Sequence, residues 1–283
     1  MAPVSYPDRM RADGLCDPAT VTLAARQLLG TVCLRAGLAC PLFASVQDGE
    51  AALTHLAADP SATIRLTSDA DRVPHYTRLC PSDYSHLDVE GVRNRKRDLD
   101  VLQRLGLTPG DTRRARYLYE LLFARIETPV GICTGDTPGW EGCPLAAGGA
   151  YEQVRAKGWG AMVSARTGDS KEEARHCSAE RMRQDPVLHV RPHHLMCMSC
   201  WYGVCDGQTP RANDTLDVLC ERILADPDVR IRLVEGNCEA CYCCDGFHPE
   251  STRCVHAGGL LRDYKKDLDV FQKLGLMPGA VLA

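Results

Sequence analysis

The chain has 283 residues, of which 45% are hydrophobic and 25% are charged, and its formal net charge is −4. These values are typical of a globular protein with a buried core, and a weakly acidic chain has no general attraction for nucleic acid or anionic lipid. Residues 1–10 contain no apolar secretion segment, and no apolar run approaches the roughly 18 residues that a membrane helix needs. We therefore expect a cytoplasmic protein that binds neither nucleic acid nor membranes.

The first part of the chain, about residues 15–127, shows hydrophobic patterns typical of helices and of one strand. A proline ends the second helix, because proline cannot continue one, and the closing helix ends at Gly106, which suits the left-handed position that follows a helix. The predicted elements are a helical segment over 19–36, a helix over 48–58, a strand over Thr63–Thr67 and a helix over about 90–105.

The last part of the chain, about residues 187–283, shows the same order of predicted elements, and its closing helix ends at Gly275. The intervening segment, about 128–186, has no counterpart elsewhere in the chain. The elements of the last part are helices over 193–203 and 213–225, a strand over Val229–Val234 and a helix over 260–274. In the segment 128–186 the predicted elements are a helix near 150–157, a strand over Trp159–Val163 and a helix over Ser170–Arg183.

An internal repeat underlies this similarity. Residues 96–110 match residues 265–279 almost position by position, and the similarity extends upstream through Ile64-Arg65-Leu66 and Ile231-Arg232-Leu233. The repeated residues are mostly packing and capping positions. We predict an α+β protein built on a duplicated helix-helix-strand-helix unit. Its domains are a degenerate N-terminal repeat (1–127), an inserted cysteine-bearing segment (128–186) and a C-terminal repeat (187–283).

The chain contains 16 cysteines, and they are unevenly placed. Disulfides are rare in a reducing compartment. Clustered cysteines there favour metal binding over redox-active thiols and over disulfides. Nine of them fall within one stretch of about sixty residues: Cys197, Cys200, Cys205, Cys220, Cys238, Cys241, Cys243, Cys244 and Cys254.

Three of these cysteines have the spacing by which bacterial ferredoxins hold three irons of a [4Fe–4S] cluster. Cys238, Cys241 and Cys244 form a Cys-x-x-Cys-x-x-Cys run, which needs a fourth ligand from a distant part of the chain. Cys197 and Cys200 lie on one face of a predicted helix, and either could supply that ligand.

Two histidines stand at the start of that predicted helix. His193 and His194 follow Pro192, which suits the first helical turn, and they precede Cys197 by only a few residues. Imidazoles near a metal site commonly hydrogen-bond to its ligands, and these two could also move protons. The alternative is that they are ordinary helix-start residues bonded to the backbone.

The run Arg191-Pro192-His193-His194-Leu195-Met196-Cys197, followed by a Cys-x-x-Cys loop after a strand, a further cysteine and an Asp-rich closing helix, resembles a family of bacterial domains. These small domains of unknown function carry an Arg-Pro-His-His-Leu-x-Cys motif, and the resemblance covers about residues 188–278. It implies an iron–sulfur protein of a kind common in anaerobes. The ligands that it implies are Cys197, Cys238, Cys241 and Cys254. This set competes with the ferredoxin-type set, which includes Cys244.

A second [4Fe–4S] cluster is a further hypothesis. Cys133 and Cys143 lie in a loop rich in glycine, threonine and proline, and Cys80 and Cys143 each precede a proline, as the last ligand of the bacterial ferredoxin run does. With Cys177 these residues would make four ligands. The alternative is that the four thiols are small buried hydrophobic groups.

Three functions remain open. The first is electron transfer, or an accessory redox role, with a redox partner protein. The second is an enzyme whose open iron site acts as a Lewis acid on a small-molecule substrate, with His193, His194, Asp206 or Asp245 as acid or base. The third is a structural zinc site. We rank electron transfer first; the sequence leaves the oligomeric state open.

Overall fold

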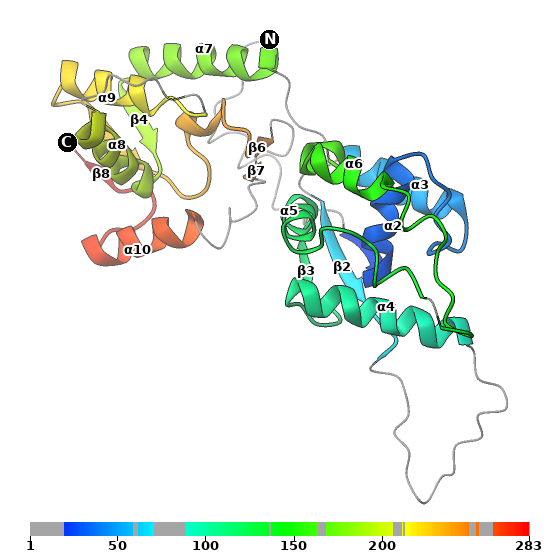
Figure 1. The fold of residues 1–283 in the computed structure, drawn as a ribbon. Coiled ribbons are helices and arrows are strands. Elements are labelled where there is room, and N and C mark those ends of the chain that lie inside the picture. Colours follow the sequence, from blue (N-terminus) through cyan, green and yellow to red (C-terminus); the bar gives the residue numbers. More distant parts are fainter. Residues whose placement is uncertain are drawn as a thin grey trace, which may run out of the picture. The chain divides into compact units, whose positions relative to one another are not determined.

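The computed structural model confirms a mixed α+β chain (Figure 1). It divides into two compact units, which we call the first unit (within 18–164) and the second unit (within 165–283). In the part of the chain that is described, no helix is both long enough and apolar enough to cross a bilayer. The structure describes residues 20–58, 62–70, 89–135, 137–163, 168–205, 211, 213–248, 253–254 and 263–282.

The first unit is a small sheet covered by helices. Strand β2 is central, parallel to β1 and antiparallel to β3. Helices α2, α4 and α5 each contribute to the apolar core, for example with the fully buried side chains of Leu28, Leu102 and Leu118. Its elements are β1 (Thr20–Ala24), α2 (Ala25–Arg35), α3 (Val46–Ala58), β2 (Thr63–Thr67), α4 (Val89–Leu105), β3 (Thr112–Arg114), α5 (Ala115–Arg125), α6 (Ala150–Ala156) and a 3-10 turn (Trp159–Ala161).

The second unit has a sheet of the same order. Strand β5 is central, parallel to β4 and antiparallel to β8. A separate two-stranded ribbon pairs β6 with β7. Its elements are α7 (Gly168–Gln184), β4 (Val187–Val190), α8 (Pro192–Cys205), α9 (Leu216–Ala225), β5 (Arg230–Leu233), a 3-10 turn (Glu239–Cys241), β6 (Phe247–His248), β7 (Arg253–Cys254), α10 (Lys265–Leu274) and β8 (Val281–Leu282).

Helices α4 and α10 end in the same way. Helix α4 ends at Gly106, with a φ of 66°, and α10 ends at Gly275, with a φ of 65°. A side chain with a Cβ is strained in this left-handed region, which explains the glycine in both places. The chain then returns to the central strand, where the Gly110 and Gly279 amides donate to the Leu66 and Leu233 carbonyls.

Two expected elements differ from the observed ones. The helix predicted over 19–36 begins with strand β1, because the alternating Thr20–Ala24 run pairs with β2 and only then does the chain turn into α2. The strand predicted over Trp159–Val163 is a 3-10 turn. Its short apolar run fits either structure by pattern, and no described strand pairs with it.

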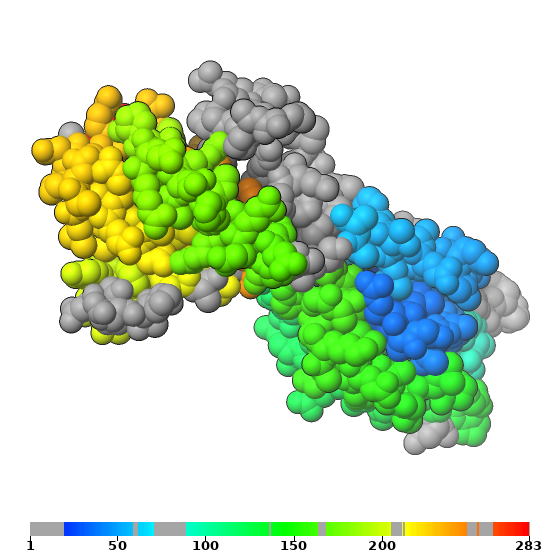
Figure 2. Space-filling model, turned by 90° about the horizontal axis from the view of Figure 1, so that it is seen from above, coloured from blue at the N-terminus to red at the C-terminus, as the bar shows by residue number. Residues whose placement is uncertain are grey.

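The segment predicted as an insert contributes to both units. Ile132 and Tyr151 are buried in the core of the first unit, whereas Ala179 and Met182 on α7 are buried in the core of the second. Figure 2 shows green atoms of this segment beside the dark-blue atoms of the early chain on one face of the first unit, and α2 and α6 are in contact.

Candidate metal centre

The start of helix α8 is held by a buried carboxylate from α10. Asp267 is 0% exposed and accepts hydrogen bonds from the His193 backbone amide (3.1 Å) and from the Arg191 guanidinium, whose Nε and Nη2 lie 2.8 and 2.7 Å from Oδ2. The first amides of a helix have no partner within the helix, so this contact satisfies one of them. It also fixes where α8 begins relative to α10.

The same carboxylate orients the His193 ring. Its Nδ1 lies 2.7 Å from Asp267 Oδ1, and the residue is buried. Burial lowers the pKa of His193, and the bond to Asp267 only partly opposes this effect. His193, predicted as a candidate acid or base, therefore also acts as part of the anchor of α8.

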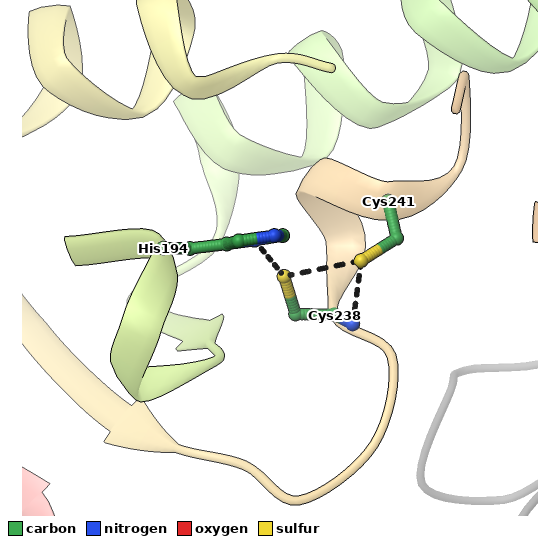
Figure 3. Close-up of side chains that lie close together, drawn as sticks. All are labelled: His194, Cys238 and Cys241. Atoms are coloured by element: carbon green, nitrogen blue, oxygen red, sulfur yellow. Dashed lines mark hydrogen bonds between the residues drawn. The ribbon is translucent and has the colours of Figure 1, made fainter. Parts of the chain in front are cut away.

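The strongest convergence of ligand atoms lies between α8 and the loop that follows β5. Cys238 Sγ is 3.1 Å from His194 Nδ1 and 3.9 Å from Cys241 Sγ, and all three atoms lie within 4.8 Å of one another. Figure 3 shows the His194 ring pointing from its helix toward the two sulfurs. The 3-10 turn at Glu239–Cys241 brings the two cysteines to the same side of the loop.

The two thiols of this site differ in acidity. Burial by itself would raise the pKa of Cys238, but the hydrogen bond from Cys241 and the nearby Arg191 charge lower it below the usual value. The same hydrogen bond, together with burial, raises the pKa of Cys241 well above its usual value. Cys238 is thus the more acidic thiol of the pair, and a thiolate is the form that binds metal.

A cavity of about 250 Å³ opens beside this pair and collects further cysteines. Cys197 comes from α8, Cys241 and Cys244 from the loop after β5, and Cys254 from β7. His193 and His194 also line the cavity, while Cys238 is fully buried next to it. Four of the cysteines predicted as ligands thus line one space in the second unit, and the sulfur of the fifth, Cys238, lies 3.9 Å from that of Cys241.

Two further contacts shape the electrostatics of this cavity. Cys244 accepts a hydrogen bond from the Gly246 amide (3.3 Å), the kind of backbone contact that stabilises a metal-bound sulfur. Arg191 is buried, and although burial alone would lower its pKa, the charges of Cys241 and Asp267 raise it. It therefore remains a cation next to the thiols. The sequence analysis assigned no role to Arg191 or Asp267, although Arg191 opens the Arg-Pro-His-His-Leu-x-Cys motif and the Asp267 motif repeats at Asp98.

Of the other candidate residues, Asp245 lines this cavity, whereas the rest do not line it or lie outside the described residues. Cys200 is exposed on α8, Cys243 is buried without lining the cavity, and Asp245 pairs with Lys171 at 2.8 Å. The side chain of Cys205 and the whole of Asp206 lie outside the described residues.

The four ligands predicted for a second cluster are not seen together. Cys133 and Cys143 lie in the first unit, Cys177 lies on α7 in the second, and Cys80 is outside the described residues. The first two instead share a cavity with Cys33 and Cys40, which the sequence analysis did not select as ligands.

The chain was compared with family models, with curated proteins and with solved structures, and none of them matches it.

Proposed function

We propose that the second unit binds one [4Fe–4S] cluster and serves in electron transfer or as an accessory redox protein. The observation that carries this proposal is the cavity lined by Cys197, Cys241, Cys244 and Cys254, with the buried Cys238 sulfur 3.9 Å from that of Cys241. A cubane cluster needs four thiolates around a space that holds four irons and four sulfides. A single metal ion needs neither five cysteines nor a cavity of about 250 Å³.

The contacts around these thiols support a redox role. His194 Nδ1 lies 3.1 Å from Cys238 Sγ, and the Gly246 amide donates to Cys244. Hydrogen bonds to ligating sulfurs are a main means by which proteins set a cluster's reduction potential. Cys197 and Cys254 are half-buried, so a cluster here would lie near the surface of its unit, within reach of a partner protein.

The likeness of residues 188–278 to the bacterial Arg-Pro-His-His-Leu-x-Cys domains supports the same proposal. Of the four ligands that this likeness implies, Cys197, Cys241 and Cys254 line the cavity, and Cys238 lies against Cys241. Cys244, the additional ligand of the ferredoxin-type set, lines the same cavity, so both sets remain candidates. A cytoplasmic, reducing location would keep these thiols available for metal.

A structural zinc site is the second candidate, and one distance favours it. Two thiolates that bind one zinc ion at about 2.3 Å with tetrahedral angles lie roughly 3.8 Å apart. The Cys238 and Cys241 sulfurs are 3.9 Å apart, and His194 is close enough to be a third ligand. In a cubane cluster the thiolates bind different irons and lie farther apart.

The test is elemental analysis of the full chain purified without oxygen. We expect about four irons and four sulfides per chain to be lost in the Cys238→Ser/Cys241→Ser variant, and we expect dithionite to bleach the visible absorption of the unmodified chain. Cys220→Ser is the matched control, because Cys220 is buried on α9 in the same unit and does not line the cavity.

Other outcomes would contradict this proposal. Stoichiometric zinc without sulfide, lost in the same double variant, would replace the redox function with the structural zinc site. Metal content that the double variant does not change would contradict both candidates.

A further inference from the structure

Helix α8 has an exposed side that carries no charge. Its fourteen residues, Pro192–Cys205, include no Asp, Glu, Lys or Arg, although these residues make up 25% of the whole chain. Met196 is 57% exposed and Val204 is 88% exposed. Ser199 and Cys200, which lie between them, are exposed as well. A helix with so few charged side chains is normally buried on all sides.

These exposed residues share one face of the helix. Met196, Cys200 and Val204 follow one another at intervals of four residues, and Ser199 lies three residues after Met196, so their side chains are neighbours on the helix surface. We call these four residues the open face of α8. A Cβ built on Gly203 would meet nothing within 4 Å, which shows that the space beside this part of the helix is empty.

The matching face of the first unit is covered. The pairing of β1 with β2 and of β4 with β5 aligns the two units, so that Leu29 of α2 matches Met196 and Val32 matches Ser199. Both residues of α2 are 0% exposed. Helix α6 packs against α2, and the loop before α6 contributes Leu145 to a cavity that Leu29 also lines. The cover in the first unit is therefore a helix and its apolar loop.

The neighbouring helix shows the same contrast. In the repeated run, Leu105 of α4 matches Leu274 of α10; Leu105 is 1% exposed and Leu274 is 60% exposed. Helix α5 packs against α4 in the first unit, whereas α10 packs against α8 in the second (Figure 1). Both helices of the α8–α10 pair thus expose apolar residues at positions that the first unit buries.

We propose that the open face of α8 binds a second copy of this chain, with α8 packed against α8. A two-fold contact places the same surface on both sides, so charged residues would meet their own kind and repel. The open face avoids this repulsion because it carries no charge. The centres of homodimer interfaces are apolar and depleted of charge in the same way.

The residues of the open face suit such a contact. Ser199, Cys200 and Gly203 are small, so two helices can approach closely, while Met196 and Val204 supply apolar area on either side of them. A stable interface buries about 800 Å² on each partner, more than one short helix offers, and the exposed Leu274 of α10 is available to extend it. A redox partner would instead be guided by complementary charges, which the open face does not offer.

This dimer goes beyond the function proposed above and does not depend on it, because none of the four residues of the open face is among the candidate ligands of the cavity. It has one consequence for that function. Cys197 lies on the same helix as the open face, so a dimer formed through α8 would bring the two metal centres of its copies near each other.

The first experiment measures the mass of the full chain in solution by light scattering after gel filtration without oxygen. We expect twice the 31.0 kDa of one chain at high concentration. Val204→Arg should weaken the association about tenfold or more, because it places like charges in the contact. Leu224→Arg is the matched control, since Leu224 is 62% exposed on α9 in the same unit, and it should not change the mass.

Three results of this experiment would overturn the proposal: a monomer at every concentration, a dimer that Val204→Arg leaves intact, or a dimer that Leu224→Arg weakens equally. Val204 is almost fully exposed, so its replacement removes no contact within the fold. The circular dichroism spectrum of each variant checks that the chain is folded.

A second measurement uses the unmodified chain. Cys200 lies in the middle of the open face, so its alkylation should be slower at high concentration, where the chain is dimeric, than at low concentration. Cys177 on α7 is the reference and should react at the same rate at both concentrations. Cys200 that reacts equally fast in the dimer, or that is already protected in the monomer by its own chain, would contradict the proposal. Neither readout requires bound metal, so a chain without a cluster is tested in the same way.

Discussion

The two units hold the start of one helix in the same way. In the second unit, Asp267 of α10 binds the His193 amide and the Arg191 side chain at the start of α8. In the first unit, Asp98 of α4 binds both the backbone amide and the guanidinium of Arg26 at the start of α2, each at 2.7 Å. Both carboxylates are buried. The repeated aspartate is therefore part of the scaffold, a helix cap supplied by a distant helix.

The units differ in where the scaffold carries its thiols. The residue after the capped position is His194 in the second unit and Gln27 in the first. Three residues farther along each helix, the second unit has Cys197 where the first has Gly30. The second unit surrounds its cavity from α8, from the loop after β5 and from β7. The first uses the end of α2 and two other loops. The same arrangement of strands and helices therefore carries its cysteines on different elements in the two units.

The two units share strand order, pairing directions and the helix cap; that one arose by duplication of the other stays a prediction. If the two units are equivalent, the same substitution at matching positions should lower the stability of both, by amounts that depend on the local contacts.

The largest effect is expected from removing the buried carboxylates. Asp267→Ala should lower the free energy of unfolding by about 3–5 kcal/mol, because it leaves the buried Arg191 cation and a helix amide without their partner, and Asp98→Ala should lower it by about 1–3 kcal/mol, because Arg26 is partly exposed. Asp267→Ala should cost more, since Arg191 and His193 both depend on it, whereas Asp98 serves Arg26. Urea unfolding of the metal-free chain measures both. A smaller loss for Asp267→Ala than for Asp98→Ala would contradict this order.

The next effect concerns the histidine that only the second unit has. His194→Ala should weaken metal binding there by about 10- to 100-fold, the usual cost of losing a group that ligates or supports a metal-bound sulfur. Competition with a chelator measures the change. Gln27→Ala is the matched control, because Gln27 bonds to the Ala24 amide and the Leu42 carbonyl instead of to a thiol. Equal affinities for the His194→Ala variant and the unmodified chain would exclude His194 from the site.

A smaller difference is expected at the two helix ends. Gly106→Ala and Gly275→Ala should each cost about 1–2 kcal/mol, because alanine is strained at positive φ. Gly106→Ala should cost more, because its Cβ would lie 2.9 Å from Arg125 Nη1, which donates to the Leu105 carbonyl, whereas a Cβ at Gly275 meets nothing within 4 Å. Thermal unfolding of the two variants ranks them, and the reverse order would contradict this account of the closing turns.

The smallest effect is expected on the exposed faces of the closing helices. Lys96 pairs with Asp100, and Lys265 pairs with Asp269, each four residues apart on a helix surface. Lys96→Ala and Lys265→Ala should each change stability by no more than about 0.5 kcal/mol. The change should shrink further in 1 M salt, where the screening length falls to about 3 Å. A loss above about 1 kcal/mol in either variant would mean that the pair has a role beyond the surface.

Much of the fold was accessible from local patterns. Strand β2 has the predicted bounds, and α3, α4 and α7 lie within two residues of theirs, because Asp-Pro, Gly106 and alternating apolar residues are strong local signals. Strand β1 was missed, since its apolar residues continue into α2 and only pairing with β2 separates the two. The Cys238–Cys241 pair was found because three-residue spacing is visible in the sequence.

The sequence by itself determined the kinds of residue available and their local geometry: the helices, the turns after them and the Cys-x-x-Cys loop. Only the tertiary structure decided which distant groups meet. Asp267 lies 76 residues from Arg191, and about a hundred residues separate Cys33 and Cys40 from Cys133 and Cys143. Hydrophobic burial drives such contacts, and it specifies which faces pack together without leaving a local spacing that could be read in advance.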